Sequence, residues 1–194
     1  MKVDSFDATA NYKLGVIYLL GLGCEKDILK ALEYFEVAKS DAHALNAIGV
    51  IHYLAPDVFE TDPVKLYPFG KIRRDLKKSV KSLEEAAEKG NLNARYNLGV
   101  IHLDDTLVPS KFSLGRAYDY FKSAASKGHT LSSYNLGVMN YLGFGTYKSC
   151  KVALTFFKHI NTVGEQAQIL KRAHKMAEVG KYVQSAFIYM ELAE

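Results

Sequence analysis

The chain has 194 residues, of which 48% are apolar and 24% are charged, and its formal net charge is +4 at pH 7. This is an ordinary globular composition on a chain long enough to bury a sizeable core, and such a charge does not by itself indicate a nucleic-acid partner. No stretch approaches the roughly 18 to 20 apolar residues that cross a bilayer, and two cysteines are too few to define a disulfide framework.

The predicted first helices of four successive units carry one short pattern. It is written YKLGVIYL, NAIGVIHY, YNLGVIHL and YNLGVMNY, at residues 12–19, 46–53, 96–103 and 134–141. In each copy a Leu or Ile follows a small residue by four positions and precedes an Ile or Met by three. At about 100° per residue these positions share one stripe of a helix, which is therefore predicted to be the buried face.

A glycine follows the Leu or Ile in every copy, as Gly15, Gly49, Gly99 and Gly137. Glycine inside a helix costs about 1 kcal/mol relative to alanine, so its recurrence predicts the close approach of a neighbouring helix. The neighbours are predicted to be second helices that carry a small-large-small stripe, with Phe35, Phe121 and Phe157 as the large residues. In the second repeat the stripe is looser, at Ser79, Ser82, Leu83 and Ala86.

Further glycines mark the turns and ends of the repeats. The sequences GLG at 21–23 and GFG at 143–145 are predicted to turn between helices, and Gly90, Gly128 and Gly164 to end second helices. The copies are expected at 8–41, 42–90, 91–128, 129–164 and, more divergent, 165–194, with an insert at 54–74. Because such repeats stack on their neighbours, we expect a single all-α solenoid over 1–194. This right-handed α-α superhelix would have about five helix pairs and be a fragment of a longer array.

A second stripe on the first helices is the candidate partner-binding surface. Positions two before and five after the Leu or Ile lie opposite the buried stripe, yet they are mostly apolar or aromatic, which is unusual for a surface helix. These positions hold Tyr12, Leu19, Asn46, Tyr53, Tyr96, Leu103, Tyr134 and Tyr141. Two alternatives stay open: tighter packing against the next repeat, or a concave groove in which rigid aromatic side chains anchor a partner.

No constellation of chemically active residues is evident. His52 and His102 occupy equivalent positions but lack a third ligand, so packing and hydrogen bonding are their expected roles. Cys150, His159 and His174 have no orienting acid, and the loop GFGTYKS lacks the G-K-S/T tripeptide of a phosphate site. We therefore expect no catalytic residue, cofactor or metal. Cys24 and Cys150 lie in turns three repeats apart, which leaves only an intermolecular disulfide open.

Two further segments depart from the repeat. The insert 54–74 contains three prolines among aromatic residues, and it is either a variable loop or one that docks a partner or the solenoid itself. Its end opens a basic cluster of Lys71, Arg73, Arg74, Lys77, Lys78 and Lys81. No aromatic stacking platform accompanies this charge, so it is either a solvated helix start or a site for an anionic partner, and no nucleic acid is expected.

The repeat pattern resembles the Sel-one-like repeat, a relative of the tetratricopeptide repeat. The resemblance covers about residues 8–194, and residues 12–39, YKLGVIYLLGLGCEKDILKALEYFEVAK, follow the pattern nearly throughout. It implies a non-catalytic scaffold.

A narrower resemblance involves SKGHTLSSYNLGVMNYLGFGTYKSCKVALTFFKHI, with the pair Ser149 and Cys150 after the turn, and the following VGKYVQSAFIYMELAE. These stretches are similar to the luminal adaptors of Hrd-type membrane ubiquitin ligases. The resemblance implies a role in endoplasmic-reticulum-associated degradation, with a ligase subunit, a lectin-type receptor or a misfolded client as partner, and leaves self-association open. It places the chain in the endoplasmic reticulum lumen, although the segment carries no signal sequence and no N-x-S/T acceptor site. The alternative is a cytoplasmic scaffold of the same repeats in signalling or secretion.

Overall fold

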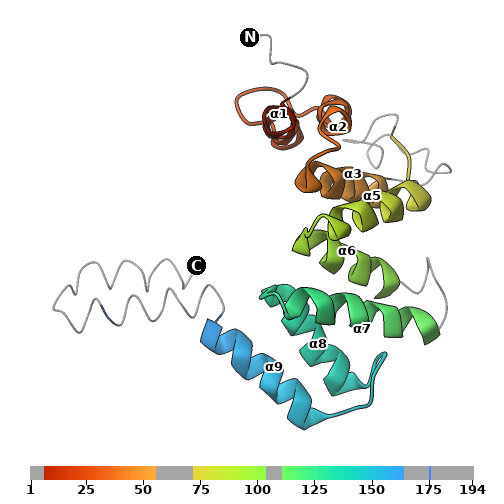
Figure 1. Ribbon diagram of the computed structural model, residues 1–194, viewed down its shortest axis with the longest axis vertical. Coiled ribbons are helices and arrows are strands. Elements are labelled where there is room, and N and C mark those ends of the chain that lie inside the picture. The colour runs from red at the N-terminus through yellow and green to blue at the C-terminus, as the bar shows by residue number, and fades with distance from the viewer. Residues whose placement is uncertain (1–6, 56–71, 104–110, 164–174, 176–194) are drawn as a thin grey trace. The chain divides into compact units, whose positions relative to one another are not determined.

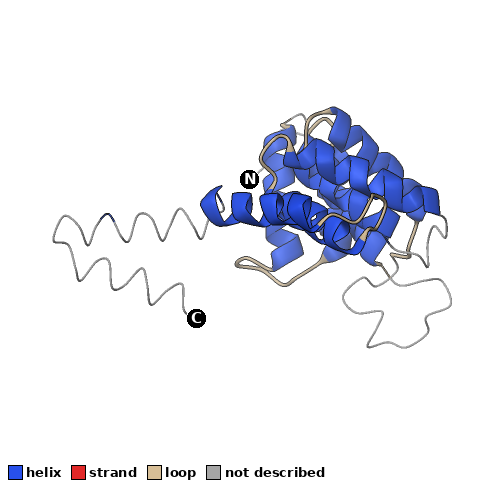
Figure 2. Cartoon of the chain, turned by 90° about the horizontal axis from the view of Figure 1, so that it is seen from below, coloured by secondary structure: helices blue, strands red, loops and turns tan. Residues whose placement is uncertain are grey.

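The computed structural model describes residues 7–55, 72–103, 111–163 and 175. Within these ranges every regular element is a helix and there is no strand (Figures 1 and 2). By their internal contacts the helices belong to two compact units, one within residues 1–101 and the other within residues 102–194. The insert between 56 and 71 and nearly all of the predicted fifth repeat lie outside the described residues.

The first unit is built from consecutive helices that pack in chain order. They are α1 (Ala8–Leu20), α2 (Ile28–Val37), α3 (Ala42–Leu54), α5 (Leu76–Glu88) and α6 (Leu92–Leu103), whose last two residues already belong to the second unit. Helix α1 packs on α2, α2 on α3 and α3 on α5 (Figure 1). The first helices predicted around 12–19, 46–53 and 96–103 are confirmed as α1, α3 and α6.

Aspartate side chains fix where the helices of this unit begin. Asp7 Oδ1 accepts hydrogen bonds from the amides of Thr9 and Ala10 at 2.9 and 3.1 Å, and so caps α1. The helices α2, α3 and α5 are capped in the same way by Asp27, Asp41 and Asp75, which accept from backbone amides at 3.0, 2.6 and 2.9 Å. Each cap satisfies an amide that has no partner inside the helix, which is typically worth about 1 kcal/mol.

The core of the first unit lies between α2 and α3. Ala31, Phe35 and Ala38 of α2 form the predicted small-large-small stripe, and none of them is exposed to solvent. Ala44 and Ile48 of α3 belong to the same buried cluster and are equally inaccessible. Burying a phenylalanine side chain stabilises the fold by about 1.5 to 3 kcal/mol, so Phe35 is a principal contributor to this core.

The helix glycines of this unit lie against large side chains. A Cβ atom added to Gly15 would stand 2.6 Å from Cδ1 of Phe35, and one added to Gly49 would stand 2.6 Å from Cγ of Leu83. Ser79 provides the small neighbour in the second repeat, and its hydroxyl donates to the carbonyl oxygen of Gly49 at 2.7 Å. This is the close approach that the repeated glycine predicts.

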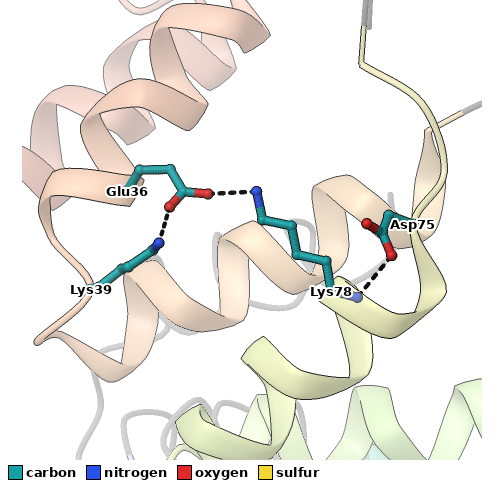
Figure 3. A network of polar contacts seen from close by, with 4 residues as sticks. All are labelled: Glu36, Lys39, Asp75 and Lys78. Carbon is teal, nitrogen blue, oxygen red and sulfur yellow. Dashed lines mark hydrogen bonds and ion pairs between the residues drawn. The ribbon is translucent and has the colours of Figure 1, made fainter.

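An ion-pair network joins α2 to α5 at the surface of the first unit (Figure 3). The Glu36 carboxylate pairs with Lys39 in its own segment and, at 2.8 Å, with the ammonium of Lys78 in α5. Partial burial would raise the pKa of Glu36, but the hydrogen bonds and charges of Lys39 and Lys78 outweigh it and hold the pKa below its ordinary value. Lys78 also belongs to the basic cluster predicted from the sequence, so part of that cluster is used inside the fold.

Both edges of the predicted insert are fixed to the first unit. Ile72 is buried in the α2–α3 core, and Nε of Arg74 donates to the carbonyl oxygen of Ala55 at 3.3 Å.

The second unit contains α7 (Lys111–Ala125), α8 (Thr130–Leu142) and α9 (Cys150–Val163), in which α7 packs on α8 and α8 on α9. Its buried residues again follow the predicted stripes, with Ala117, Phe121 and Ala124 on α7 and Leu136 and Met139 on α8. A Cβ atom at Gly137 would stand 2.6 Å from Cε1 of Phe157. Helix α8 ends at Gly143 in the left-handed conformation, with φ +81°, as α1 does at Gly21, with φ +72°, so the two predicted turns are confirmed.

Candidate partner-binding surface

In the first unit, the predicted surface residues pack against their own unit. The Tyr12 ring lies with its centroid 5.9 Å from that of Phe35 and 5.7 Å from that of His43. Tyr12 and Leu19 both pack against the buried cluster of α2 and α3 and are themselves half-buried. In this repeat both side chains take part in packing within the unit.

The predicted residues of the middle repeats are also half-buried. Asn46 accepts a hydrogen bond from Nδ2 of Asn97 at 2.9 Å. The guanidinium carbon of Arg74 lies 6.0 Å from the centre of the Tyr53 ring, within reach of a cation–π interaction. Tyr96 is half-buried as well.

The last two predicted tyrosines differ from the others because they are exposed. Tyr134 and Tyr141 of α8 retain 53% and 54% of their accessible surface. The Tyr134 ring lies 5.9 Å from Phe157, the same separation as between Tyr12 and Phe35, but Phe157 is only half-buried. Of the eight predicted residues, these two therefore offer the most surface to a partner.

A pocket of about 370 Å³ lies in the second unit. Among the described residues it is lined by Leu103 at the end of α6, Leu114 of α7, four residues of α8 and Phe144 of the following turn. The residues contributed by α8 are Asn135, Val138, Met139 and Leu142. These described side chains are apolar apart from the Asn135 amide, and the volume lies at the lower end of the range typical of ligand pockets.

The Gly-Phe-Gly turn holds Phe144 at the edge of this pocket. A Cβ atom added to Gly145 would stand 2.6 Å from the carbonyl carbon of Leu114, so the turn lies directly against the α7 backbone. Phe144 remains 49% exposed in this position, and Leu142 beside it is also exposed. Exposed apolar residues that gather beside an apolar pocket are typical of an interaction site.

Of the seven described residues that line the pocket, Leu103 alone was among the predicted site residues. Leu114, Leu142 and Phe144 were missed because the stripe argument considers only the first helices and only one face of them. The sequence of the turn contains a signal that could have identified Phe144. An apolar residue between two glycines of a left-handed turn has little helix surface to pack on, so its side chain is expected to be exposed. The equivalent Leu22 in the first unit is exposed in the same way.

The two histidines of the repeat ladder serve as packing residues. The His102 ring stacks on Tyr120 with centroids 5.5 Å apart and planes at 12°. Burial away from water lowers the pKa of His102, and the charge of Arg116 acts in the same direction. Burial likewise lowers the pKa of His52, with a further contribution from Lys78. A hydrogen bond with the Arg73 backbone acts on the pKa of His52 in the opposite direction.

The remaining reactive side chains do not converge. Cys24 and Cys150 are both free and exposed, and His159 is exposed on α9. His174 lies outside the described residues. Within the described ranges, no three His, Cys, Asp or Glu side chains gather as metal ligands.

The class of fold defined by these helix pairs is the all-α repeat solenoid of the tetratricopeptide type, as predicted. The chain belongs to the Sel1 repeat family: the family model, described as the Sel1 repeat, matches residues 8–43, 65–91, 92–129 and 130–158, about two thirds of the chain. The proposed repeat at 165–194 has no counterpart among these matches and stays a prediction.

Two solved structures are similar to the chain. One is a protective antigen of uropathogenic Escherichia coli strains that displays an SLR fold, with a TM-score of 0.68 and 21% identity over 91% of this chain. The other is a Sel1 repeat protein from Oxalobacter formigenes, with a TM-score of 0.68 and 19% identity over 96% of this chain. The chain spans 35% of the first protein and 70% of the second. No curated protein matches the chain.

Sel1 repeat proteins are typically protein-interaction scaffolds, and the fold is a non-catalytic type of scaffold. At these identities the two structures support the fold and no particular partner.

Proposed function

We propose that the chain is a non-catalytic scaffold that binds other proteins, and that it acts as an adaptor in endoplasmic-reticulum-associated degradation. In this role it brings a membrane ubiquitin ligase, a substrate receptor and a misfolded client together. The observation that carries the scaffold function is the apolar surface of the second unit, where Leu142 and Phe144 are exposed at a pocket that they line and Tyr141 is exposed on the same helix as Leu142. Aromatic residues with little conformational freedom are frequent anchors at protein interfaces.

Support for the adaptor role comes from where the narrower resemblance falls. The stretch that resembles the luminal adaptors runs from Ser126 to Ile160 and covers α8, the turn and most of α9. These are the elements that form the exposed surface. Ser149 of the shared pair closes the turn, because its amide donates to the carbonyl oxygen of Asn140 at 2.8 Å and its hydroxyl accepts from the amide of Val152 at 3.3 Å.

The luminal location is part of the same proposal, and a cytoplasmic scaffold in signalling or secretion is its alternative. Among the described residues, no helix is long and apolar enough to span a membrane. A membrane ligase would therefore be engaged by this part of the chain through its protein surface. The absence of N-x-S/T sites from the sequence is the feature that favours the cytoplasmic alternative.

The test is affinity purification of the full-length protein after mild cross-linking, together with cell fractionation. We expect a membrane ubiquitin ligase subunit to be enriched with the wild-type protein and lost with the Tyr134→Ser and Tyr141→Ser double variant. Tyr147→Ser, which removes a fully exposed tyrosine outside the pocket, is the matched control and should retain the ligase. A full-length protein that fractionates with the cytosol and enriches no ligase subunit would refute the adaptor role.

A further inference from the structure

The net charge of the chain is confined to one stretch. Residues 102–163 contain seven Lys and Arg but only three Asp and Glu, whereas residues 1–101 contain fourteen of each and residues 164–194 contain four of each. The formal charge of +4 is therefore carried entirely by 102–163. In the described part of α7, α8 and α9, Asp119 is the only carboxylate residue.

One of these cations lies beside the turn that borders the apolar pocket. Nζ of Lys148 lies 5.9 Å from the centre of the Tyr141 ring. A Cβ atom added to Gly143, between the lining residues Leu142 and Phe144, would stand 3.2 Å from Cβ of Lys148. An exposed positive charge therefore stands next to the turn that carries Phe144.

We propose that this pocket and the Gly-Phe-Gly turn bind a segment of a partner protein in which bulky apolar side chains are flanked by Asp or Glu. The inference rests on the proposed scaffold function and specifies the partner of the same surface. The apolar side chains would enter between Leu114, Val138 and Met139 and cover Phe144. An acidic flank would meet Lys148, and the Asn135 amide provides a hydrogen-bonding group for the backbone of the segment.

Charge complementarity favours this occupant over a second copy of the chain. If a second copy bound through the same stretch, two basic surfaces would face each other and repel. Residues 1–101 of a second copy have no net charge, so they would gain nothing from the basic charge of this stretch. Charges at the rim of an interface act chiefly by steering the encounter and by rejecting partners of the same sign. In the proposed complex the apolar pocket contributes affinity, and Lys148 with the basic charge of the stretch selects against basic partners.

The experiment uses a fluorescein-labelled peptide with a Leu-Phe-Leu core between Asp-Glu flanks, and its fluorescence anisotropy is measured while the whole chain is titrated in. Two control peptides carry the same core between Lys-Arg flanks, or a Ser core between the acidic flanks. We expect the acidic apolar peptide to bind at least about tenfold more tightly than either control. Equal binding of the basic peptide, or of the peptide with the Ser core, would overturn the proposal.

Matched variants then locate the binding site. Phe144→Ser and Lys148→Glu should each weaken binding of the acidic apolar peptide by about tenfold. Tyr147→Ser and Lys127→Glu change an exposed aromatic residue and an exposed cation that are not among the lining residues, and should leave binding unchanged. Since all four residues are exposed, circular dichroism should show the same helicity in every variant. If the control variants weaken binding as much as Phe144→Ser does, the proposal is wrong.

The result is separable from the adaptor role. If the peptide binds as expected while the full-length protein enriches no ligase, the adaptor role fails and the pocket stands. If the ligase is enriched while the Phe144→Ser variant binds the peptide like wild type, the proposed pocket fails and the adaptor role stands.

Discussion

Replacing Gly15 by alanine tests the packing principle of the repeat with the smallest possible change. The added methyl group would stand 2.6 Å from Cδ1 and 2.9 Å from Cζ of Phe35. Ordinary van der Waals contact between carbon atoms begins near 3.5 Å, so the ring or the helix must retreat by roughly 1 Å. Phe35 has no exposed surface and lies within the cluster that includes Ala44 and Ile48, so there is no free space for this movement.

Two opposing terms set the magnitude. Alanine in place of glycine inside a helix gains about 1 kcal/mol of helix propensity, whereas overpacking a well-packed core costs about 1 to 3 kcal/mol. We expect the overpacking term to dominate, so Gly15→Ala should lower the free energy of unfolding by about 1 kcal/mol. Gly137→Ala should cost less, because its neighbour Phe157 is only half-buried and its ring can turn toward solvent.

Gly115 provides the matched control for this experiment. It also lies inside a helix, α7, but no atom stands within 4 Å of a Cβ added there. Gly115→Ala should therefore stabilise the protein by about 0.5 to 1 kcal/mol. The assay is urea unfolding followed by far-ultraviolet circular dichroism. If Gly15→Ala were as stable as wild type, or as stabilising as Gly115→Ala, the close-approach explanation of the repeated glycine would be wrong.

Three further predictions concern polar groups. Because burial holds the pKa of His102 below its ordinary value of 6.5, the unfolded chain takes up the proton first and stability falls as the pH drops below about 6.5. His102→Phe keeps the stacking on Tyr120, and its melting temperature should fall less between about pH 7.5 and 5.5 than that of the wild-type protein. If the melting temperature fell equally in both proteins, the lowered pKa of His102 would not be the cause of the pH dependence. The pKa of Glu36 is also lowered from its ordinary value of 4.5. The ion pairs of Glu36 therefore stabilise the fold fully at pH values above 4.5, and this stabilisation is lost as the pH falls through the lowered pKa. Glu36→Gln should lower the free energy of unfolding by about 0.5 to 1 kcal/mol at neutral pH, a value reduced because solvent screens these partly exposed charges. In acid, where Glu36 is protonated, the substitution should have no effect. An equal loss of stability at both pH values would disprove the role of the ion pairs. Ser79→Ala removes the buried hydrogen bond to Gly49 and should cost about 1 kcal/mol in urea unfolding, whereas Ser123→Ala on the exposed side of α7 should cost little.

The repeat architecture was predictable because local chemistry and packing agree in these helices. The four copies of the first-helix pattern coincide with α1, α3, α6 and α8, and the second-helix stripes coincide with buried residues of α2, α5 and α7. A glycine that is unfavourable in an isolated helix is informative, since only a close neighbour explains its recurrence. Leu83 in place of phenylalanine shows that the pattern tolerates a different large residue when Ser79 hydrogen-bonds to the glycine carbonyl.

The candidate site was less predictable because exposure depends on what covers a helix rather than on the helix itself. Tyr12 and Tyr134 occupy equivalent positions and lie equally far from a phenylalanine, yet only Tyr134 is exposed. The sequence pattern is the same in both repeats, so no periodicity argument separates them. The pocket was missed for a related reason: Leu114 and Phe144 come from α7 and a turn, and only the folded chain brings them to the Val138 face of α8.

The most direct test of the central claim is a titration of the methyl-labelled protein with the acidic apolar peptide, monitored by nuclear magnetic resonance. The claim is that the second unit recognises a partner through the pocket beside the Gly-Phe-Gly turn. It predicts that the methyl signals of Leu114, Val138 and Leu142 shift together and saturate, while those of Leu29 and Val37, which are exposed in the first unit, remain in place. Equal shifts in both units, or shifts in neither, would contradict the claim.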